Sequence, residues 1–327
     1  MNFTEWTRSV LARTETALDA RLPPADLEPS RLHDAMRYTT LGGGKRVRPL
    51  LVHAAGLLTG ATPDALDAAG AAIEMIHVYS LVHDDMPAMD DDSMRRGKPT
   101  VHVQYDEATA LLVGDALQSQ AFIALSAAPV PPVRQAALLR ELALASGSLG
   151  MAGGQAIDLA SVGIALDRPS LEKMHRMKTG ALLRAAVRMG ALCGEEAPDS
   201  LEASVATASG AAASGTRAGA EGGTAVAEVI EAQALAVALE RYSAAIGLAF
   251  QVVDDILDVT ADSATLGKTA GKDEKAGKPT YVSLMGLSEA RRLATELQAE
   301  AHAALAPFGE RAVRLAQLAD LIVERAN

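Results

Sequence analysis

The chain has 327 residues, 49% of them hydrophobic and 3% aromatic, and a formal net charge of −11 at pH 7. Ala and Leu dominate the apolar residues, and because both are strong helix formers the composition favours an all-α fold with a substantial core. The acidic balance argues against binding to nucleic acid or to an anionic membrane surface, which both need clustered Lys and Arg. Cys193 is the only cysteine, so an intrachain disulfide and a four-cysteine zinc site are excluded.

The sequence predicts a single helical bundle over residues 1–327. Helical periodicity recurs nearly throughout, and no alternating Val/Ile/Thr run predicts a strand. Residues 1–22 mix charged with apolar positions, which is typical of a surface helix and not of a signal peptide. No apolar run approaches the ~20 residues that cross a bilayer. We therefore expect a soluble, cytoplasmic protein without stable membrane association.

A glycine-rich loop, Gly42–Arg48 (GGGKRVR), follows the first helices. Its backbone N–H groups can approach a phosphate, and Lys45 and Arg48 supply positive charge. Taken alone, this pattern is a weak signal, because a glycine-rich loop is ordinarily a turn and the basic residues after it are ordinarily solvated.

The next feature is an acidic cluster at the end of an apolar helix over Ala68–Val82. His83–Asp92 reads HDDMPAMDDD, and like charges so close together destabilise the segment unless a cation neutralises them. His77 lies seven residues before Asp84 and therefore shares its helix face, two turns away. Arg95 and Arg96 follow the cluster and are also compatible with simple charge balance for its aspartates.

A second acidic cluster, Gln251–Asp258 (QVVDDILD), ends an apolar helix that begins at about Glu231. Asp254 and Asp258 are four residues apart and share a helix face, with Asp255 beside them. Carboxylates are the hard ligands that suit Mg²⁺, which takes one or two of them alongside substrate phosphates. Each cluster alone is compatible with a solvated helix end, but two clusters that both adjoin apolar helices favour a site for Mg²⁺ and a diphosphate.

One stretch, Ser204–Ala227, is rich in Ala, Gly and Ser and offers little large apolar surface to bury. We expect a mobile surface insertion with frayed helical ends there.

The two clusters resemble the paired aspartate-rich motifs of the polyprenyl diphosphate synthases, and the segment LVHDDMPAMDDDSMRRGKPT carries the Pro-Ala insertion of bacterial farnesyl-type enzymes. The resemblance extends from about Leu41 to Leu284 and also includes MKTG at Met177–Gly180 and TLGK ending at Lys268. It implies an isoprenoid-synthase-type helical bundle around a central cavity, a homodimer, and Mg²⁺ as cofactor, with three ions per site and Mn²⁺ as a substitute.

The resemblance also assigns roles to residues. It implies metal binding by Asp84, Asp85, Asp90, Asp254 and Asp258. It implies that isopentenyl and allylic diphosphates contact Gly44, Lys45, Arg48, His77, Arg95, Arg96, Lys178, Gln251 and Lys268. The groups expected to act in catalysis are Asp84, Asp90, Arg95, Lys178, Thr179, Gln251, Asp254 and Lys268. Gln155 and Asp158 in GGQAIDL also match, but the sequence does not separate a binding role from a packing one.

These parts fit ionisation, condensation and elimination. Metal ions and basic side chains would stabilise the departing diphosphate, the double bond of isopentenyl diphosphate would attack the allylic cation, and the departed diphosphate would take the proton. Product length would depend on a residue about one helical turn, ~5.4 Å, before Asp84. Tyr79 and Ser80 occupy that position, and an aromatic residue there resembles farnesyl-forming enzymes.

Three alternatives remain open from the sequence. Smaller residues than Tyr79 accompany longer products in the family, so the first alternative is a geranylgeranyl diphosphate synthase. A class I terpene cyclase would carry an Asn/Ser/Glu pattern in place of DDILD and would not need Lys45, Arg48 and His77. A non-catalytic regulatory subunit would have lost aspartates or phosphate-binding residues, and the motifs here are intact.

Overall fold

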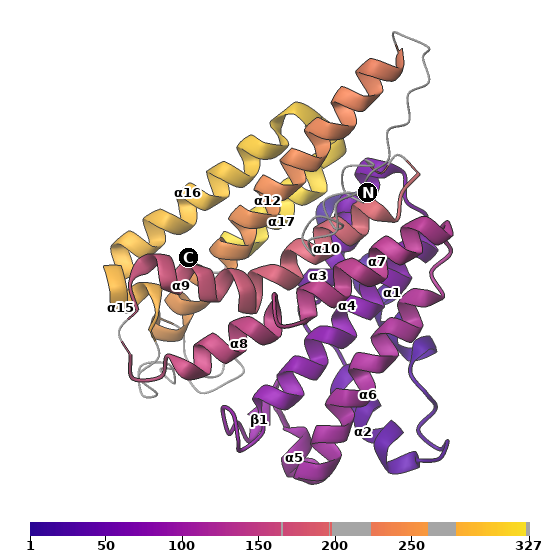
Figure 1. Cartoon of the computed structure of the whole chain (residues 1–327), viewed down its shortest axis with the longest axis vertical. Coiled ribbons are helices and arrows are strands. Elements are labelled where there is room, and N and C mark those ends of the chain that lie inside the picture. Colours follow the sequence, from indigo (N-terminus) through magenta and orange to yellow (C-terminus); the bar gives the residue numbers. More distant parts are fainter. Residues whose placement is uncertain (165, 196, 198–223, 261–278, 325–327) are drawn as a thin grey trace.

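A computed structural model describes residues 1–164, 166–195, 197, 224–260 and 279–324. Over these ranges the protein is a bundle of helices with one short β-ribbon, so the predicted all-α fold is confirmed (Figure 1). The α-helices are α1 (Phe3–Arg21), α2 (Ser30–Thr40), α3 (Val47–Gly56), α4 (Pro63–Asp84), α5 (Val101–Gln104), α6 (Glu107–Ser126), α7 (Pro132–Ser146), α8 (Met151–Ala160), α9 (Arg168–His175), α10 (Ala181–Leu192), α12 (Thr224–Thr260), α15 (Tyr281–Met285), α16 (Leu287–Leu305) and α17 (Val313–Glu324). The shorter elements are the 3₁₀ turns η1 (Leu57–Thr59) and η3 (Ala306–Ala312), the π-helical turn η2 (Arg176–Gly180), and the strands β1 (Met94–Arg95) and β2 (Lys98–Pro99).

Helix ends follow local chemistry that the sequence displays. The Asn2 side chain accepts a hydrogen bond from the backbone N–H of Glu5, whose carboxylate accepts one in return from Asn2, and this capping box starts α1. Pro63 is the first residue of α4, where its missing N–H costs nothing, and the Thr62 side chain caps the same turn. Asn2 and Pro63 therefore mark helix starts by chemistry that is local in the sequence.

The β-ribbon was not predicted. Met94 pairs with Pro99 and Arg95 with Lys98 in antiparallel register. Arg96 and Gly97 form the connection, both with positive φ (52° and 75°), which is the geometry of a two-residue hairpin turn. Strands of two residues are too short to leave an alternating pattern in the sequence.

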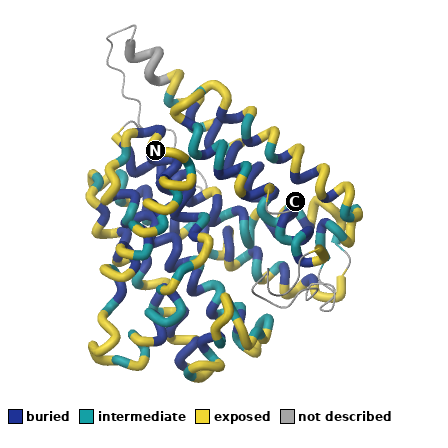
Figure 2. The backbone as a smooth tube through the Cα atoms, turned by 180° about the vertical axis from the view of Figure 1, so that it is seen from behind, coloured by how far each residue is buried: buried dark blue, intermediate teal, exposed yellow. Residues whose placement is uncertain are grey.

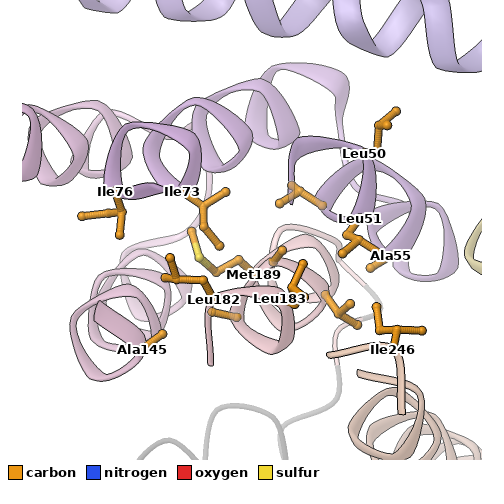
Figure 3. Close-up of a cluster of buried hydrophobic side chains, with 14 of the residues drawn as sticks. Leu50, Leu51, Ala55, Ile73, Ile76, Ala145, Leu182, Leu183, Met189 and Ile246 are labelled. Carbon is orange, nitrogen blue, oxygen red and sulfur yellow. The ribbon is translucent and has the colours of Figure 1, made fainter. Parts of the chain in front are cut away.

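The core lies where α3, α4 and α10 meet (Figure 3). Fully buried side chains from the three helices interdigitate there, among them Leu51, Ile73 and Leu183, with Ile246 of α12 beside them. Helix α10 crosses α3 at Gly190, where a Cβ atom would lie 2.2 Å from the carbonyl oxygen of Val52. Helix α12 packs against α16 and α17 to complete the other side of the molecule (Figure 1).

Three helices are long and apolar enough to span a bilayer by length and composition alone: Pro63–Asp84, Glu107–Ser126 and the stretch Ile230–Thr260 of α12. The expectation that no segment approaches that length is therefore wrong. For α4 the reason is enclosure by other helices: 78% of its apolar window is buried, so apolar residues occupy nearly all its faces. The corresponding windows of α6 and α12 are 44% and 61% buried. Figure 2 shows buried and intermediate backbone in the middle of the molecule and mostly exposed backbone along its margin.

The predicted insertion lies mostly outside the described residues, from Ser204 to residue 223. Helix α12 begins at Thr224, ahead of the expected start near Glu231, so it includes the last four residues of the insertion.

Candidate active site

A cavity of about 990 Å³ lies between α4, α8 and α12, and the loop that precedes α3 closes one side of it. Twelve of the residues predicted for the site line it: Gly44, Lys45, Arg48, His77, Tyr79, Ser80, Asp84, Arg95, Arg96, Lys178, Thr179 and Asp254. Segments more than 200 residues apart in the sequence therefore converge on one chamber, which confirms the predicted central cavity.

The polar lining is strongly biased toward positive charge. Six of the lining side chains are basic (Lys45, Arg46, Arg48, Arg95, Arg96 and Lys178), whereas three are carboxylates (Glu74, Asp84 and Asp254). The chain as a whole carries a net charge of −11. This local reversal of charge suits a polyanionic ligand.

The glycine-rich loop takes backbone conformations that favour glycine. Gly42, Gly43 and Gly44 have φ values of 94°, 100° and 137°. The guanidinium of Arg96 lies against this loop and donates a hydrogen bond to the Gly43 carbonyl oxygen at 3.0 Å. A Cβ atom on Gly44 would come within 2.9 Å of that guanidinium. The glycines therefore let an arginine of the β-ribbon lie directly on the loop.

A buried ion-pair network fixes the far end of the same loop, and sequence reasoning missed it. Arg46 donates hydrogen bonds to Glu15 of α1 at 2.8 Å, to Glu74 of α4 at 2.8 Å and to the Thr40 carbonyl at 2.6 Å. The side chains of Arg46 and Glu74 are each 1% exposed. Arg46 has a left-handed backbone, with φ 45°. It thereby ties the segment that carries Lys45 and Arg48 to α4, which carries His77 and Asp84.

Arg48 and His77 lie in the cationic part of the lining. Burial lowers the pKa of Arg48, although Glu74 and Asp254 act in the opposite direction. Burial, followed by the charges of Arg48 and Arg96, lowers the pKa of His77 well below its usual range. His77 is therefore neutral at physiological pH, and its ring can offer a diphosphate an N–H donor without a formal charge.

The first aspartate cluster divides into two environments. Burial, together with Asp90, raises the pKa of Asp84 to about 6, while Lys178 acts in the opposite direction. Asp85 is 3% exposed and accepts hydrogen bonds on both carboxylate oxygens from Arg95, at 2.6 to 2.8 Å. Arg95 also lies 3.6 Å from Asp92. The structure thus brings Asp84 into the cavity and directs Asp85 to Arg95, so metal binding by Asp85 and Asp90 stays a prediction.

The second cluster presents Asp254 to the cavity, whereas Asp255 and Asp258 are 2% and 4% exposed. In the part of the chain that the structure describes, no three His, Cys, Asp or Glu side chains gather closely enough to hold a metal ion. Two aspartates that line one cationic chamber suit Mg²⁺ that a diphosphate helps to hold, because Mg²⁺ uses one or two carboxylates together with phosphates and water. The raised pKa of Asp84 also indicates a carboxylate that would gain from a cation.

Lys178 and Thr179 stand on the π-helical turn Arg176–Gly180, a deviation that is frequent at functional sites. The turn is packed closely: a Cβ on Gly154 of α8 would lie 2.1 Å from the backbone nitrogen of Lys178. The Lys178 ammonium donates to Asp158 at 2.5 Å. Asp158 is 6% exposed, so it positions Lys178 from beneath the lining.

Gln155 and Asp158, which the sequence left undecided, thus differ in placement. Gln155 lines the cavity, and its buried amide nitrogen and oxygen have no hydrogen-bond partner among the described residues. Thr179 donates its hydroxyl to the Gln251 side-chain oxygen at 3.1 Å, which brings that predicted pair together. Lys268 lies outside the described residues.

Apolar side chains, among them Met151, Phe250 and Leu257, share the lining of the cavity with these polar groups. Tyr79 borders it and makes an edge-on contact with the His83 ring at a centroid distance of 5.9 Å. Burial raises the pKa of Tyr79, and a hydrogen bond with Gln118 of α6 acts in the opposite direction. Gln118 and His83 are two contacts of the predicted chain-length residue that sequence reasoning missed.

A family model described as "Polyprenyl synthetase" matches residues 29–212 and 207–306. The chain belongs to the polyprenyl synthetase family. A relative from Bradyrhizobium diazoefficiens, named "Probable farnesyl diphosphate synthase", is 51% identical over 98% of this chain and 86% of its own. The Escherichia coli "Farnesyl diphosphate synthase" is 43% identical over 99% of both chains. The family resemblance stated from the two aspartate motifs is therefore confirmed, as is the expectation of a prenyltransferase.

Solved structures agree with the sequence relatives. An FPP/GFPP synthase from Zymomonas mobilis has a TM-score of 0.78 and 37% identity, covering 98% of this chain and 99% of that one. A geranyltransferase from Helicobacter pylori, solved with magnesium and isoprenyl diphosphate, has a TM-score of 0.78 and 29% identity, covering 99% of this chain and 97% of that one. The predicted isoprenoid-synthase type of bundle is thereby confirmed.

Proposed function

We propose that this chain is a farnesyl diphosphate synthase that condenses isopentenyl diphosphate with dimethylallyl diphosphate and then with geranyl diphosphate. One observation carries the proposal: a single cavity is lined by a group of basic side chains with Asp84 and Asp254 and also by apolar side chains and Tyr79. The charged groups suit two diphosphates, and the apolar groups suit a prenyl chain. The names of the relatives at 43–51% identity agree with this activity.

The residues divide between the two substrates. Lys45, Arg48, His77 and Arg96, together with backbone N–H groups at Gly44, would bind isopentenyl diphosphate. Arg95, Lys178 and Lys268 would hold the allylic diphosphate as it leaves. Bound Mg²⁺ would neutralise charge on the leaving diphosphate. Asp84, Asp90 and Asp254 would hold the metal, with Asp85 and Asp258 as further ligands. Each site would bind three ions, and Mn²⁺ would substitute for Mg²⁺. The magnesium in the Helicobacter pylori structure supports the choice of metal.

The protein itself would stabilise the allylic cation with oxygen dipoles. Thr179 lines the cavity and donates its hydroxyl to Gln251, so the lone pairs of the Thr179 oxygen are available to a positive carbon. Gln251 is not among the lining residues and would act through Thr179. The departed diphosphate would accept the proton lost after condensation.

Chain length would be set by Tyr79, which is 8% exposed and held by His83 and Gln118. Ser80 is less suited to this role, because its hydroxyl donates to the His77 carbonyl oxygen at 2.8 Å within α4. Because the aromatic ring of Tyr79 lies about one turn before Asp84, it would stop the growing prenyl chain at C15. If the prenyl chain extends past Tyr79, the product is C20.

A homodimer in the cytoplasm is part of the proposal, without nucleic acid or stable membrane association. Helix α6 exposes Leu111, Leu112 and Ile123 at 49%, 54% and 58%, although its other face is buried against α4. A second copy would cover these side chains. Light scattering should then give about twice 33.9 kDa, and a Leu112→Glu variant should shift toward the monomer. A monomeric wild-type protein would contradict this part.

The activity is tested by incubating the purified protein with isopentenyl diphosphate, each allylic primer in turn and Mg²⁺. Condensation with dimethylallyl or geranyl diphosphate is the expected result. Turnover of an allylic diphosphate to a cyclic hydrocarbon without isopentenyl diphosphate would favour the terpene cyclase. A protein that is inactive with every primer would favour the regulatory subunit.

A further inference from the structure

Behind the cavity wall, a chain of hydrogen bonds joins α15 to the π-helical turn. The backbone N–H of Tyr281 donates to one carboxylate oxygen of Asp255 at 2.8 Å. The side-chain nitrogen of Gln251 donates to the other oxygen at 2.8 Å. The Thr179 hydroxyl then donates to the Gln251 side-chain oxygen at 3.1 Å. Asp255 is 2% exposed, so this chain is anchored on a buried carboxylate.

The anchor determines which way the Gln251 amide points. An amide has a donor end and an acceptor end, whereas an ionised carboxylate accepts only. Gln251 must therefore turn its NH₂ group to Asp255 and its oxygen to Thr179. The hydroxyl of Thr179 donates its proton to that oxygen, so its own lone pairs are left for the cavity.

We propose that Asp255 is a positioning residue that, through the Gln251 amide, turns the lone pairs of the Thr179 oxygen toward the allylic cation. An inverted amide would direct its NH₂ group at Thr179, and the Thr179 oxygen would then accept from that group instead of turning its lone pairs to the cavity. The inference rests on the proposed function and deepens it. It also separates Asp255 from its neighbours in the second aspartate cluster, because both of its carboxylate oxygens accept hydrogen bonds from protein donors.

Asp255→Asn tests this with nearly the same shape. The backbone N–H of Tyr281 still needs an acceptor, so the oxygen of the introduced amide turns to Tyr281 and its NH₂ group faces Gln251. The Gln251 amide must then invert. We expect kcat for condensation of geranyl diphosphate to fall about 100-fold, as when one preorganised dipole is lost. The KM for isopentenyl diphosphate and the Mg²⁺ concentration for half-maximal rate should change less than threefold.

The matched rescue is the double variant Asp255→Asn/Gln251→Glu, which exchanges the positions of amide and carboxylate. The carboxylate introduced at position 251 accepts from the amide introduced at position 255, and it still offers an oxygen to Thr179. We expect at least a tenfold higher kcat than either single variant. Gln251→Glu alone places a second carboxylate against Asp255, and the two like charges should lower kcat. If Asp255→Asn does not fold, the test is therefore still the comparison of Gln251→Glu with the double variant.

Three results would overturn the inference. The first is a kcat for Asp255→Asn within threefold of wild type. The second is a double variant that is no faster than both single variants. The third is a tenfold rise in the Mg²⁺ concentration that Asp255→Asn needs for half-maximal rate, which would mark Asp255 as a metal ligand. Wild-type protein that condenses no primer would refute the proposed function itself, which is a distinguishable failure.

Discussion

Replacing Arg46 by Met should destabilise the protein far more than removing an exposed arginine. The Glu74 carboxylate is 1% exposed and 2.8 Å from the Arg46 guanidinium, so the substitution leaves a buried charge without that partner. Breaking a buried pair from one side costs about 3–5 kcal/mol. Arg292 is the matched control: it also bridges two glutamates, Glu289 and Glu296, but its side chain is 62% exposed. Its loss should cost much less, because exposed ion pairs are screened by solvent and contribute little to stability.

The assay is equilibrium unfolding in urea, followed by circular dichroism, for wild type, Arg46→Met, Arg292→Met and the double variant Arg46→Met/Glu74→Leu. The double variant should recover much of the loss, because it removes both buried charges together. Arg46→Met should also raise the KM for isopentenyl diphosphate, since Arg46 anchors the loop that carries Lys45 and Arg48. A cost for Arg46→Met below about 1 kcal/mol, or no larger than for Arg292→Met, would refute the reasoning.

Three further changes have defined outcomes. Burial lowers the pKa of His175 to about 4, so as pH falls below ~6.5 this histidine binds a proton in the unfolded chain before it does so in the folded protein. The free energy of unfolding should therefore drop by about 2 kcal/mol between pH 7.5 and 5.0 because of this group. If urea unfolding of His175→Gln shows the same pH dependence as wild type, this assignment is wrong. Gly154→Ala should lower kcat at least tenfold by displacing Lys178, whereas Gly70→Ala, with its Cβ 3.5 Å from Pro49, should leave steady-state kinetics intact. EDTA should abolish condensation and added Mg²⁺ should restore it, and full activity after chelation would contradict the metal proposal.

Local signals predicted much of the fold and of the site. Prolines such as Pro63 and Pro132 mark helix starts because the residue itself restricts the backbone. The two aspartate clusters were visible because several like charges fall within a few residues. Asp84 and Asp254 therefore reached the cavity as expected.

What the sequence left out depends on contacts between distant segments. Nothing in the neighbours of Arg46 shows that Glu15 and Glu74 will surround it, or that Asp158 will hold Lys178. The strands of the β-ribbon are too short to display a pattern. The apolar character of α4 also reflects enclosure by other helices, which a hydropathy profile does not separate from a membrane span.

The most direct test of the central claim is the length of the product, measured by mass spectrometry after phosphatase treatment. Wild type with geranyl diphosphate, isopentenyl diphosphate and Mg²⁺ should give a C15 alcohol. Tyr79→Ala should extend it to C20 or beyond, whereas Tyr105→Ala, an aromatic substitution outside the cavity lining, should still give C15. A C20 product from wild type, or a Tyr79→Ala enzyme that stops at C15, would contradict the proposed product and the role of Tyr79.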